Sequence, residues 1–246
     1  KFPVIVVGNL SAGGSGKTPH VELLLSILSE NYKTAMLSRG YKRKSRGFLI
    51  ANEASTSQKI GDELYQIMHK FPQTTVVVCE NRVEGISRLI KASPEIQVVV
   101  LDDGFQHRAL KPGLSILLTD YNLLYTRDRM LPAGRLRESS FSSLRADIII
   151  VTKCPDDIKP IDLRVVETEL NPMPYQSLFF SKTNYEPLKP VFVNEALPES
   201  LENIALANKH VLFVAGIVSP EHAVAKIQEY CREVEMLIFP DHYEFV

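Results

Sequence analysis

The residues with the clearest chemical content stand near the start of the chain, where Gly16-Lys17-Thr18 ends a glycine-rich turn. An apolar run at residues 4–7 precedes this turn, and a helical pattern follows it. This order is typical of a P-loop, in which backbone N–H groups, a lysine and a hydroxyl meet phosphate oxygens and Mg²⁺ at a helix N-terminus. The residues predicted to bind the nucleotide are Ser11, Ala12, Gly13, Gly14, Ser15, Gly16, Lys17 and Thr18.

The loop departs from the usual pattern at one position. The glycine that normally stands before the four variable residues of a P-loop is Ser11 here, and Gly13 and Gly14 lie inside the loop instead. The alternative interpretation is a Gly/Ser turn with a chance Lys-Thr pair. The strand before the loop and the helix after it favour nucleotide binding.

A pair of adjacent carboxylates, Asp102-Asp103, follows the apolar run at residues 96–101. Taken alone, a strand that ends in Asp-Asp-Gly is a common turn. In P-loop enzymes, however, a carboxylate in this place holds Mg²⁺ and through it the nucleotide phosphates. Together with Lys17 and Thr18, the pair predicts a magnesium site, in which one aspartate could bind the metal while the other orients a nucleophile or a cation.

Two loops are rich in cations. Residues 39–46 contain five Lys or Arg residues and no acid, and the glycines at positions 40 and 47 suggest that this loop is mobile. Residues 127–137 contain four arginines. Each loop is either a solvated surface or an anion site, since arginine binds phosphoryl oxygens bidentately. The place of the first loop, after a predicted strand, favours an anion site there.

Asp62 and Glu63 follow Gly61 and begin a helical pattern. Two acids in this position usually stabilise a helix N-terminus, because carboxylates there oppose the helix dipole. Catalysis by one of them is the alternative that the spacing leaves open.

The elements that must position these residues alternate along the chain. Apolar strands are predicted at residues 4–7, 33–37, 74–79, 96–101, 114–119 and 146–153. With helices between them, they predict an α/β fold with a P-loop NTPase-type three-layer α/β/α core over residues 1–154. Prolines punctuate residues 155–187, which predicts an extended, β-ribbon-like connector. A strand at residues 210–216, a helix from about residue 219 to residue 230 and a strand at residues 235–239 predict a smaller α/β lobe over residues 188–246, which is expected to be incomplete at its C-terminus.

Composition excludes several classes of protein. With 246 residues, 45% of them hydrophobic, the chain can bury a large core, and its net charge of −1 gives no reason to expect nucleic acid as a partner. The three cysteines are an odd number without C-x-x-C spacing, as in reduced cytosolic proteins. No apolar run approaches about 18 residues, so the chain by itself is expected to be soluble. Because it begins at Lys1, we expect an N-terminal segment to precede it.

Six blocks of the sequence together resemble the tetraacyldisaccharide 4′-kinase family of the lipid A pathway in Gram-negative bacteria. The resemblance follows the whole chain in order, and it includes the small hydroxyl residue at Ser11. The blocks lie at residues 7–19, 37–41, 61–63, 101–108, 131–138 and 239–242. One departure is Gly134-Arg135, where the family usually has Gly-Pro, which puts the rigidity of that loop in question.

This resemblance implies transfer of the γ-phosphoryl group of ATP, with Mg²⁺, to the 4′-hydroxyl of a tetraacylated glucosamine disaccharide 1-phosphate. The catalytic residues that it implies are Asp62, His242, Asp102, Asp103 and Arg137. The implied substrate-binding residues are Arg39, Tyr41, Glu63, Arg82 and His107, and the implied metal ligands are Thr18, Asp102, Asp103 and Glu138.

The resemblance further implies a place at the cytoplasmic face of the inner membrane, reached through a hydrophobic N-terminal segment that is expected to precede Lys1. The sequence leaves the oligomeric state open, and a monomer is favoured. A protein of another class remains the alternative: a P-loop NTPase switch or metallochaperone-like protein, in which hydrolysis drives exchange of a partner. Hydrolysis stimulated by a protein partner and indifferent to the lipid would distinguish that alternative.

Overall fold

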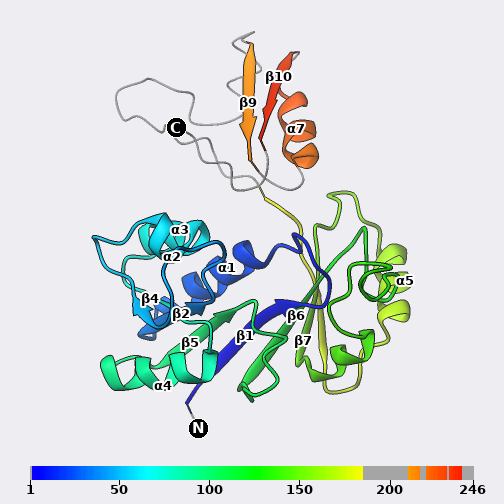
Figure 1. The fold of residues 1–246 in the computed structure, drawn as a ribbon. Helices are drawn as coiled ribbons and strands as arrows, with labels where there is room; N and C mark the ends of the chain where they lie inside the picture. The colour runs from blue at the N-terminus through cyan, green and yellow to red at the C-terminus, as the bar shows by residue number, and fades with distance from the viewer. Residues whose placement is uncertain (1, 185–209, 217–219, 232, 240–246) are drawn as a thin grey trace. The chain divides into compact units, whose positions relative to one another are not determined.

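The computed structural model describes residues 2–184, 210–216, 220–231 and 233–239 (Figure 1). The chain divides into two compact units, Lys1–Lys182 and Thr183–Val246. None of the described helices is long and apolar enough to cross a bilayer.

The first unit is built on a sheet of eight described strands. Their order across the sheet is β3-β4-β2-β5-β1-β6-β7-β8, and every neighbouring pair is parallel except β3 and β4. The strands are β1 (Val4–Asn9), β2 (Thr34–Ser38), β3 (Leu49–Ile50), β4 (Thr75–Val78), β5 (Val98–Asp102), β6 (Leu114–Asp120), β7 (Ile148–Thr152) and β8 (Ser177–Phe180). The helices of this unit are α1 (Lys17–Ser29), α2 (Ser57–Ile60), α3 (Asp62–Lys70), α4 (Arg82–Ala92), the 3₁₀ helix Ser140–Arg145 and α5 (Pro160–Leu170).

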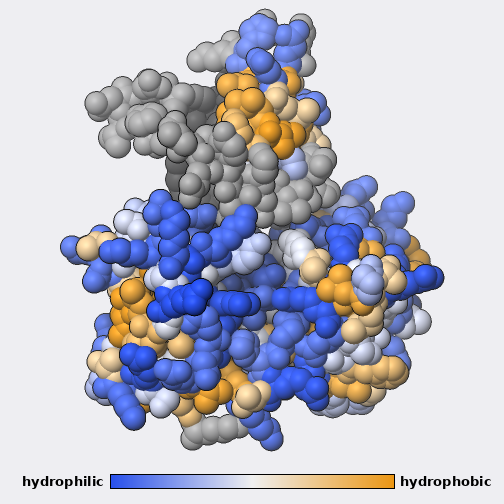
Figure 2. All heavy atoms as spheres, viewed as in Figure 1, coloured by the Kyte–Doolittle hydropathy of each residue, from blue (hydrophilic) through white to orange (hydrophobic). Residues whose placement is uncertain are grey.

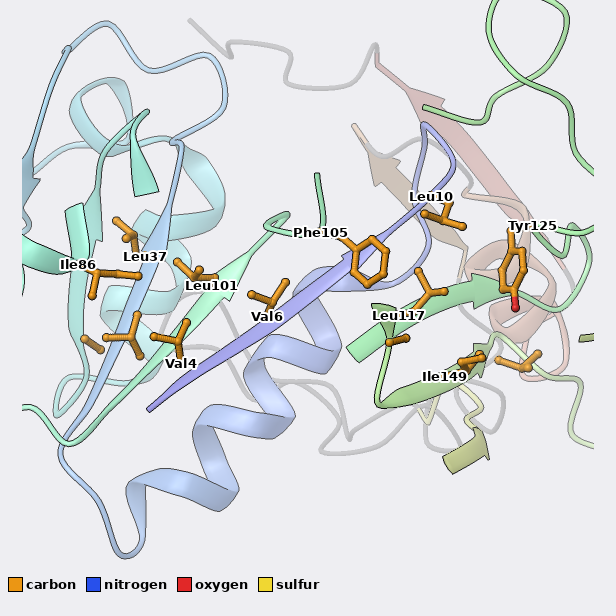
Figure 3. Packing of buried hydrophobic residues seen from close by; sticks show 14 of the residues in the cluster. Val4, Val6, Leu10, Leu37, Ile86, Leu101, Phe105, Leu117, Tyr125 and Ile149 are labelled. Atoms are coloured by element: carbon orange, nitrogen blue, oxygen red, sulfur yellow. The ribbon is translucent and has the colours of Figure 1, made fainter. Parts of the chain in front are cut away.

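Helices cover both faces of this sheet. Neighbouring residues of β1 point to opposite sides, so Val6 joins one buried cluster and Val7 the other. The Val6 cluster includes residues of α4 and α5 and is drawn in Figure 3, whereas the Val7 cluster includes residues of α1 and α3. Because both faces are buried, the central strands are mostly apolar, with polar residues at or near their ends. The predicted three-layer α/β/α core is therefore confirmed.

The carboxyl ends of the parallel strands bring the chemically interesting segments together. The loops after β1, β2, β5 and β6 all leave the sheet at the same edge, as the parallel pairing requires. The loop after β5 approaches β1 so closely that a side chain at Gly8 would place its Cβ 2.6 Å from the Cβ of Phe105. The residues predicted to bind phosphate and metal thus share one edge.

The segment predicted as a ribbon-like connector differs in the structure. Residues 160–170 form the helix α5, and residues 177–180 form β8, which pairs in parallel with β7 and extends the sheet by one strand. Pro160 begins α5, where a missing N–H costs nothing, so this proline starts a helix and does not interrupt one. β7 is therefore not the last strand of the sheet, and the first unit continues to residue 182, beyond the predicted core of residues 1–154.

The described part of the second unit contains β9 (Val211–Ala215), α7 (Glu221–Gln228) and β10 (Val234–Ile238). The two strands pair in parallel, with the helix between them in sequence. A strand, a helix and a strand are the elements that the sequence predicts over residues 210–239 of the smaller lobe.

Candidate functional site

The glycine-rich loop joins β1 to α1 as predicted. Gly13 has φ of 117° and Gly16, at the N-terminus of α1, has φ of 79°, in a region that favours glycine. A Cβ at Gly14 would meet nothing within 4 Å, so the backbone there is open to a ligand. The first turn of α1 contains no acidic residue, and the positive end of the helix is free to attract an anion.

Hydrogen bonds to neighbouring segments fix the backbone of this loop. The backbone N–H of Ala12 donates to the carbonyl oxygen of Arg135 at 2.6 Å, and the hydroxyl of Thr152 donates to that of Ser15 at 3.0 Å. His20 Nδ1 lies 2.7 Å from the carbonyl oxygen of Gly16. The loop is therefore pre-shaped by its neighbours, as electrostatic catalysis requires.

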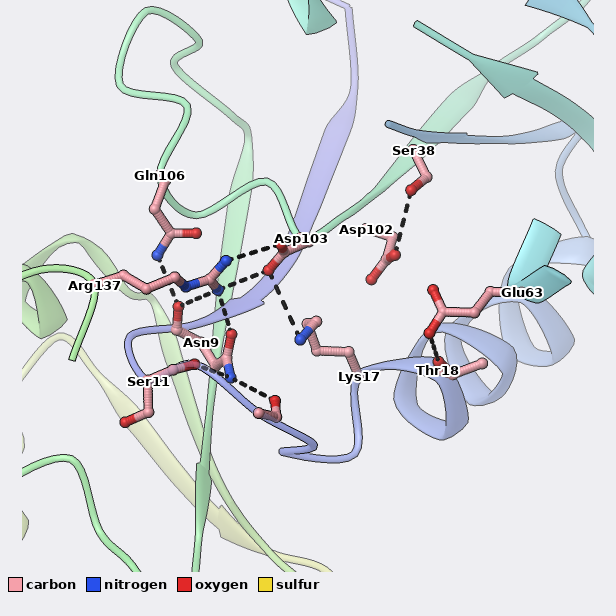
Figure 4. A network of polar contacts seen from close by, with 11 residues as sticks. Asn9, Ser11, Lys17, Thr18, Ser38, Glu63, Asp102, Asp103, Gln106 and Arg137 are labelled. Atoms are coloured by element: carbon pink, nitrogen blue, oxygen red, sulfur yellow. Dashed lines mark hydrogen bonds and ion pairs between the residues drawn. The ribbon is translucent and has the colours of Figure 1, made fainter. Parts of the chain in front are cut away.

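A polar network centred on Asp103 connects the loop to the strands beside it (Figure 4). Arg137 donates to both carboxylate oxygens of Asp103, at 2.7 and 2.9 Å, and Lys17 Nζ lies 3.8 Å from Asp103 Oδ1. Arg137 also donates to Asn9 Oδ1 at 2.5 Å, and Asn9 donates to the carbonyl oxygen of Ser11 at 2.7 Å. One side chain, Asn9, thus connects the Arg137–Asp103 ion pair to the P-loop.

The two adjacent aspartates have opposite electrostatic environments. Burial, with the nearby Glu63 carboxylate, raises the pKa of Asp102 to about 7. Burial also acts to raise the pKa of Asp103, but the hydrogen bonds from Arg137 and the charge of Lys17 outweigh it and lower that pKa below its usual value. Around neutral pH, Asp103 is ionised and Asp102 is held close to its titration point.

One carboxylate oxygen of Asp102 is available to bind a ligand. It is only 4% exposed; Ser38 Oγ donates to its Oδ2 at 3.4 Å, while its Oδ1 has no hydrogen-bond partner. Figure 4 shows Asp103 turned toward Arg137 and Lys17, and Asp102 turned toward Ser38. A buried, unpaired carboxylate oxygen beside a P-loop fits a hard divalent cation.

The N-terminus of α3 meets the N-terminus of α1. Asp62 and Glu63 are both exposed in the first turn of α3, after Gly61. Thr18 Oγ1 donates to Glu63 Oε1 at 3.3 Å, so Glu63 stands against the P-loop (Figure 4). The predicted helix start at these acids is confirmed, and it places them beside the loop from a distant part of the sequence.

Arg82 and His107 also lie close to Asp103. Arg82 is 3% exposed and donates to the carbonyl oxygens of Cys79 and Glu80 at 3.2 and 2.9 Å, and its charge acts on Asp103. Burial and the charge of Arg82 lower the pKa of His107, which favours its neutral form. The predicted substrate-binding residues Arg82 and His107 are therefore close to the predicted catalytic aspartates.

The basic loop after β2 is more ordered than its glycines suggest. Arg43, whose side chain is 2% exposed, pairs with Glu80 at 2.5 Å and donates to the carbonyl oxygen of Gly47 at 2.7 Å. Arg43 therefore stabilises the loop, leaving the other cations for ligands. A surface pocket of about 650 Å³ lies here, lined by Arg39, Gly40, Tyr41, Lys42, Arg43, Ser45, Arg46 and Glu80.

The predicted metal ligands are only partly gathered. Glu138 accepts hydrogen bonds from Arg145 at 2.8 Å and from Ser142 at 3.0 Å, through Oε2. In the described part of the chain, no three His, Cys, Asp or Glu side chains lie close enough to hold a metal ion, so the set with Glu138 is not assembled. Thr18 and Asp102 remain as the residues that fit a cation. His242 lies outside the described residues.

Asn9 and Gln106 are contributors that the sequence analysis missed. Asn9 is 1% exposed, and its carbonyl oxygen accepts from Gln106 Nε2 at 2.8 Å. Both residues stand inside the sequence blocks at residues 7–19 and 101–108, which was the available signal.

Replacing Asn9 by alanine is expected to destabilise the protein by about 2–3 kcal/mol, because Arg137 loses a buried acceptor and Ser11 a donor. Chemical denaturation measures this change. Asn122→Ala is the control, since Asn122 is exposed and donates to Asp120 Oδ1 through its backbone N–H, which alanine keeps. A loss below about 0.5 kcal/mol would contradict the connecting role of Asn9.

Comparisons with known proteins agree with this site. Residues 1–246 match the family described as tetraacyldisaccharide-1-P 4′-kinase. Two proteins named tetraacyldisaccharide 4′-kinase, from Bacteroides thetaiotaomicron and Parabacteroides distasonis, are 51% and 50% identical over 99% of this chain. The chain spans 66% of the length of each, just under two thirds.

A solved structure gives the same result at the level of the fold. LpxK from Aquifex aeolicus, crystallised in complex with ATP, is 31% identical, with a TM-score of 0.74. The match covers 100% of this chain and 74% of that one.

Proposed function

The chain belongs to the tetraacyldisaccharide-1-phosphate 4′-kinase family, and we propose that it transfers the γ-phosphoryl group of ATP to the 4′-hydroxyl of a tetraacyl glucosamine disaccharide 1-phosphate. The observation that carries the proposal is the network in which Lys17, Asp103 and Arg137 meet at the N-terminus of α1. It combines a phosphate-binding loop with acids and cations that can neutralise a transferring phosphoryl group.

The P-loop positions the nucleotide in this proposal. Backbone N–H groups of residues 11–18 and the ammonium of Lys17 hold the β- and γ-phosphates, whose charge the positive end of α1 favours. Arg137 is fixed by Asp103 and Asn9 and offers its planar guanidinium to the transferring group. ATP use is supported by the complex of the Aquifex aeolicus relative.

Magnesium completes the site in this proposal, held by Thr18 and Asp102, with Asp103 beside them. When bound, it supplies positive charge that offsets the charge of the phosphates. Glu138 is proposed to complete the polar network around the metal, with its Oε2 bound to Arg145 and its Oε1 without a partner.

Asp62 is proposed as the base that receives the proton of the sugar hydroxyl. Its carboxylate is exposed at the start of α3, next to Glu63, which contacts the P-loop residue Thr18. A sugar hydroxyl is too weak an acid to ionise beforehand, so a carboxylate must accept the proton as the bond to phosphorus forms. His242 is proposed to support Asp62.

The lipid headgroup is proposed to occupy the pocket after β2. Arg39 and Tyr41 line it, together with the cations that Glu80 does not pair. An anionic sugar phosphate is complementary to such a lining, since one guanidinium group can donate two parallel hydrogen bonds to the oxygens of a phosphoryl group. His107 lies close enough to Arg39, Arg82 and Asp103 for their charges to act on it.

The proposal places a monomeric protein at the cytoplasmic face of the bacterial inner membrane, where the lipid substrate resides. The family match favours this kinase over a P-loop switch or metallochaperone-like protein. In a switch, a protein partner would stimulate hydrolysis of the nucleotide, and the lipid disaccharide would leave the rate of hydrolysis unchanged.

Replacing Asp62 by asparagine is expected to lower kcat about 10²-fold while the Kd for ATP changes little, because only proton transfer is impaired. The measurement is transfer of labelled phosphate from ATP to tetraacyldisaccharide 1-phosphate in detergent, with the full-length protein. Glu84→Gln is the matched control, since Glu84 is also an exposed acid in the first turn of a helix.

Two outcomes would overturn parts of the proposal. Wild-type protein that hydrolyses ATP or GTP but labels no lipid would remove the kinase function. Labelled lipid with an Asp62→Asn variant as active as the Glu84→Gln control would keep the kinase and remove Asp62 as its base.

A further inference from the structure

An exposed loop with an apolar tip stands beside the P-loop. Met130 is 46% exposed and Leu131 is 56% exposed, and Pro132 and Ala133 are exposed as well. We call residues 129–135 the arginine-flanked loop, because Arg129 and Arg135 are exposed at its two ends. On the face of the first unit drawn in Figure 2, apolar residues gather in separate patches within a mainly hydrophilic surface.

Hydrogen bonds within the arginine-flanked loop fix the shape of its exposed tip. The N–H of Leu131 donates to the carbonyl oxygen of Leu136 at 3.0 Å, and Asp128 Oδ1 accepts from the N–H groups of Arg129 and Arg135 at 2.8 and 3.0 Å. At Gly134, a Cβ would lie 2.4 Å from the carbonyl oxygen of Arg129. The turn is therefore tight, and its apolar side chains are presented outward at a fixed place.

The loop is attached directly to the candidate active site. The carbonyl oxygen of Arg135 accepts from Ala12, and Leu136 forms an isolated bridge with Ser11. The tip therefore belongs to the same edge of the sheet as the P-loop. The loop after β2 adds Lys42, Lys44 and Arg46 to that edge.

We propose that the arginine-flanked loop docks on an anionic lipid surface, with Met130 and Leu131 in the apolar boundary and Arg129 at the phosphate headgroups. Exposed apolar side chains bracketed by cations are complementary to such a surface, and each juxtamembrane cation adds to the attraction. The inference rests on the proposed function, because a tetraacyl substrate lies in a bilayer and the edge with the P-loop must approach it. Docking through this loop turns that edge toward the lipid.

The test compares binding of the full-length protein to vesicles of phosphatidylglycerol and phosphatidylethanolamine with binding to phosphatidylcholine vesicles. Met130→Ser with Leu131→Ser is expected to weaken binding to the anionic vesicles about tenfold or more. Arg129→Glu is expected to weaken it about fivefold. Ile161→Ser with Val165→Ser is the matched control, since these α5 residues are 62% and 54% exposed.

A positional probe complements the binding measurement. A tryptophan at Leu131 is expected to shift its emission to the blue on anionic vesicles and to be quenched by brominated lipid, whereas a tryptophan at Ile161 is not. Unchanged vesicle binding of the Met130/Leu131 variant, or an equal loss in the Ile161/Val165 control, would overturn the inference. A blue shift without vesicles would show that another part of the protein covers the tip, which also overturns it.

Kinase activity in detergent separates this inference from the proposed function. Both double variants are expected to phosphorylate detergent-solubilised substrate like the wild type, while only the Met130/Leu131 variant loses activity on substrate in vesicles. Absence of lipid phosphorylation by the wild type in detergent would instead remove the proposed function.

Discussion

Replacement of Lys17 by methionine is expected to lower kcat for lipid phosphorylation about 10³-fold while leaving the protein folded. Methionine keeps most of the length of the side chain and removes its charge. Lys17 Nζ lies 3.8 Å from Asp103, which keeps its two hydrogen bonds from Arg137, so the ion network survives the change. What is lost is the charge that opposes the growing negative charge on the phosphoryl oxygens.

Single-turnover kinetics with saturating ATP measure this effect apart from binding. Lys70→Met is the control. Lys70 is half exposed at the end of α3, and its Nζ lies 2.7 Å from Glu22, which is on the same helix α1 as Lys17. Because its lysine is half exposed to solvent, this pair is expected to contribute little to stability. If Lys17→Met kept more than a tenth of the wild-type rate, the proposed role of the P-loop lysine would be wrong.

The sequence predicts the central part of this site because local patterns determine it. The order of strand, glycine-rich loop and helix fixes where Lys17 and Thr18 stand, and the apolar run before Asp102 fixes the other half. Since parallel strands end at one edge, both halves had to meet there. The structure confirms this arrangement.

Contacts between distant segments are what the sequence did not disclose. Arg43 looks like one more cation of a basic loop, yet its partner Glu80 comes 37 residues later and makes it structural. Glu138 follows Arg137 in a block that suggested a metal ligand, and the structure adds that Arg145 pairs with its Oε2 while its Oε1 has no partner. Which of several neighbouring charges pairs internally depends on packing that no local pattern encodes.

The connector shows a different reason for a missed element. Prolines at residues 155, 160, 172 and 174 suggested extended chain, but Pro160 starts α5, and the short β8 gains its place by pairing with β7. β8 has only four residues, and along it exposed positions alternate with partly buried ones. A strand so short and half exposed is defined by its neighbour in the sheet.

Replacing the two adjacent aspartates by asparagine is expected to change stability in opposite directions in protein freed of divalent cations by EDTA. Asp102 has its pKa raised to about 7, so its ionised form disfavours the folded state. Wild-type stability is therefore lost as the pH rises from the ordinary value near 3.8 to about 7. Asp102→Asn removes that loss, and above pH 7 it is expected to stabilise the protein by about 2 kcal/mol and at most about 4 kcal/mol.

Asp103→Asn is expected to do the reverse. Its pKa is lowered, chiefly because the hydrogen bonds from Arg137 outweigh the effect of burial, so its ionised form stabilises the folded state. That stability is present above the unfolded pKa and is lost as the pH falls through the folded pKa. At pH 7 the substitution leaves Arg137 without its carboxylate partner, and the expected cost is roughly 1–3 kcal/mol.

Urea unfolding of the three proteins between pH 4 and pH 8 measures both effects. The difference between Asp102→Asn and wild type is expected to be near zero at the acid end and to grow up to about pH 7, because Oδ1 of Asp102 has no hydrogen bond to lose. The same variant is expected to lose about 10²-fold or more in kinase activity, since the carboxylate that destabilises the metal-free protein is the one proposed to hold the cation. A destabilised Asp102→Asn at every pH would show that the carboxylate serves the fold and not a ligand.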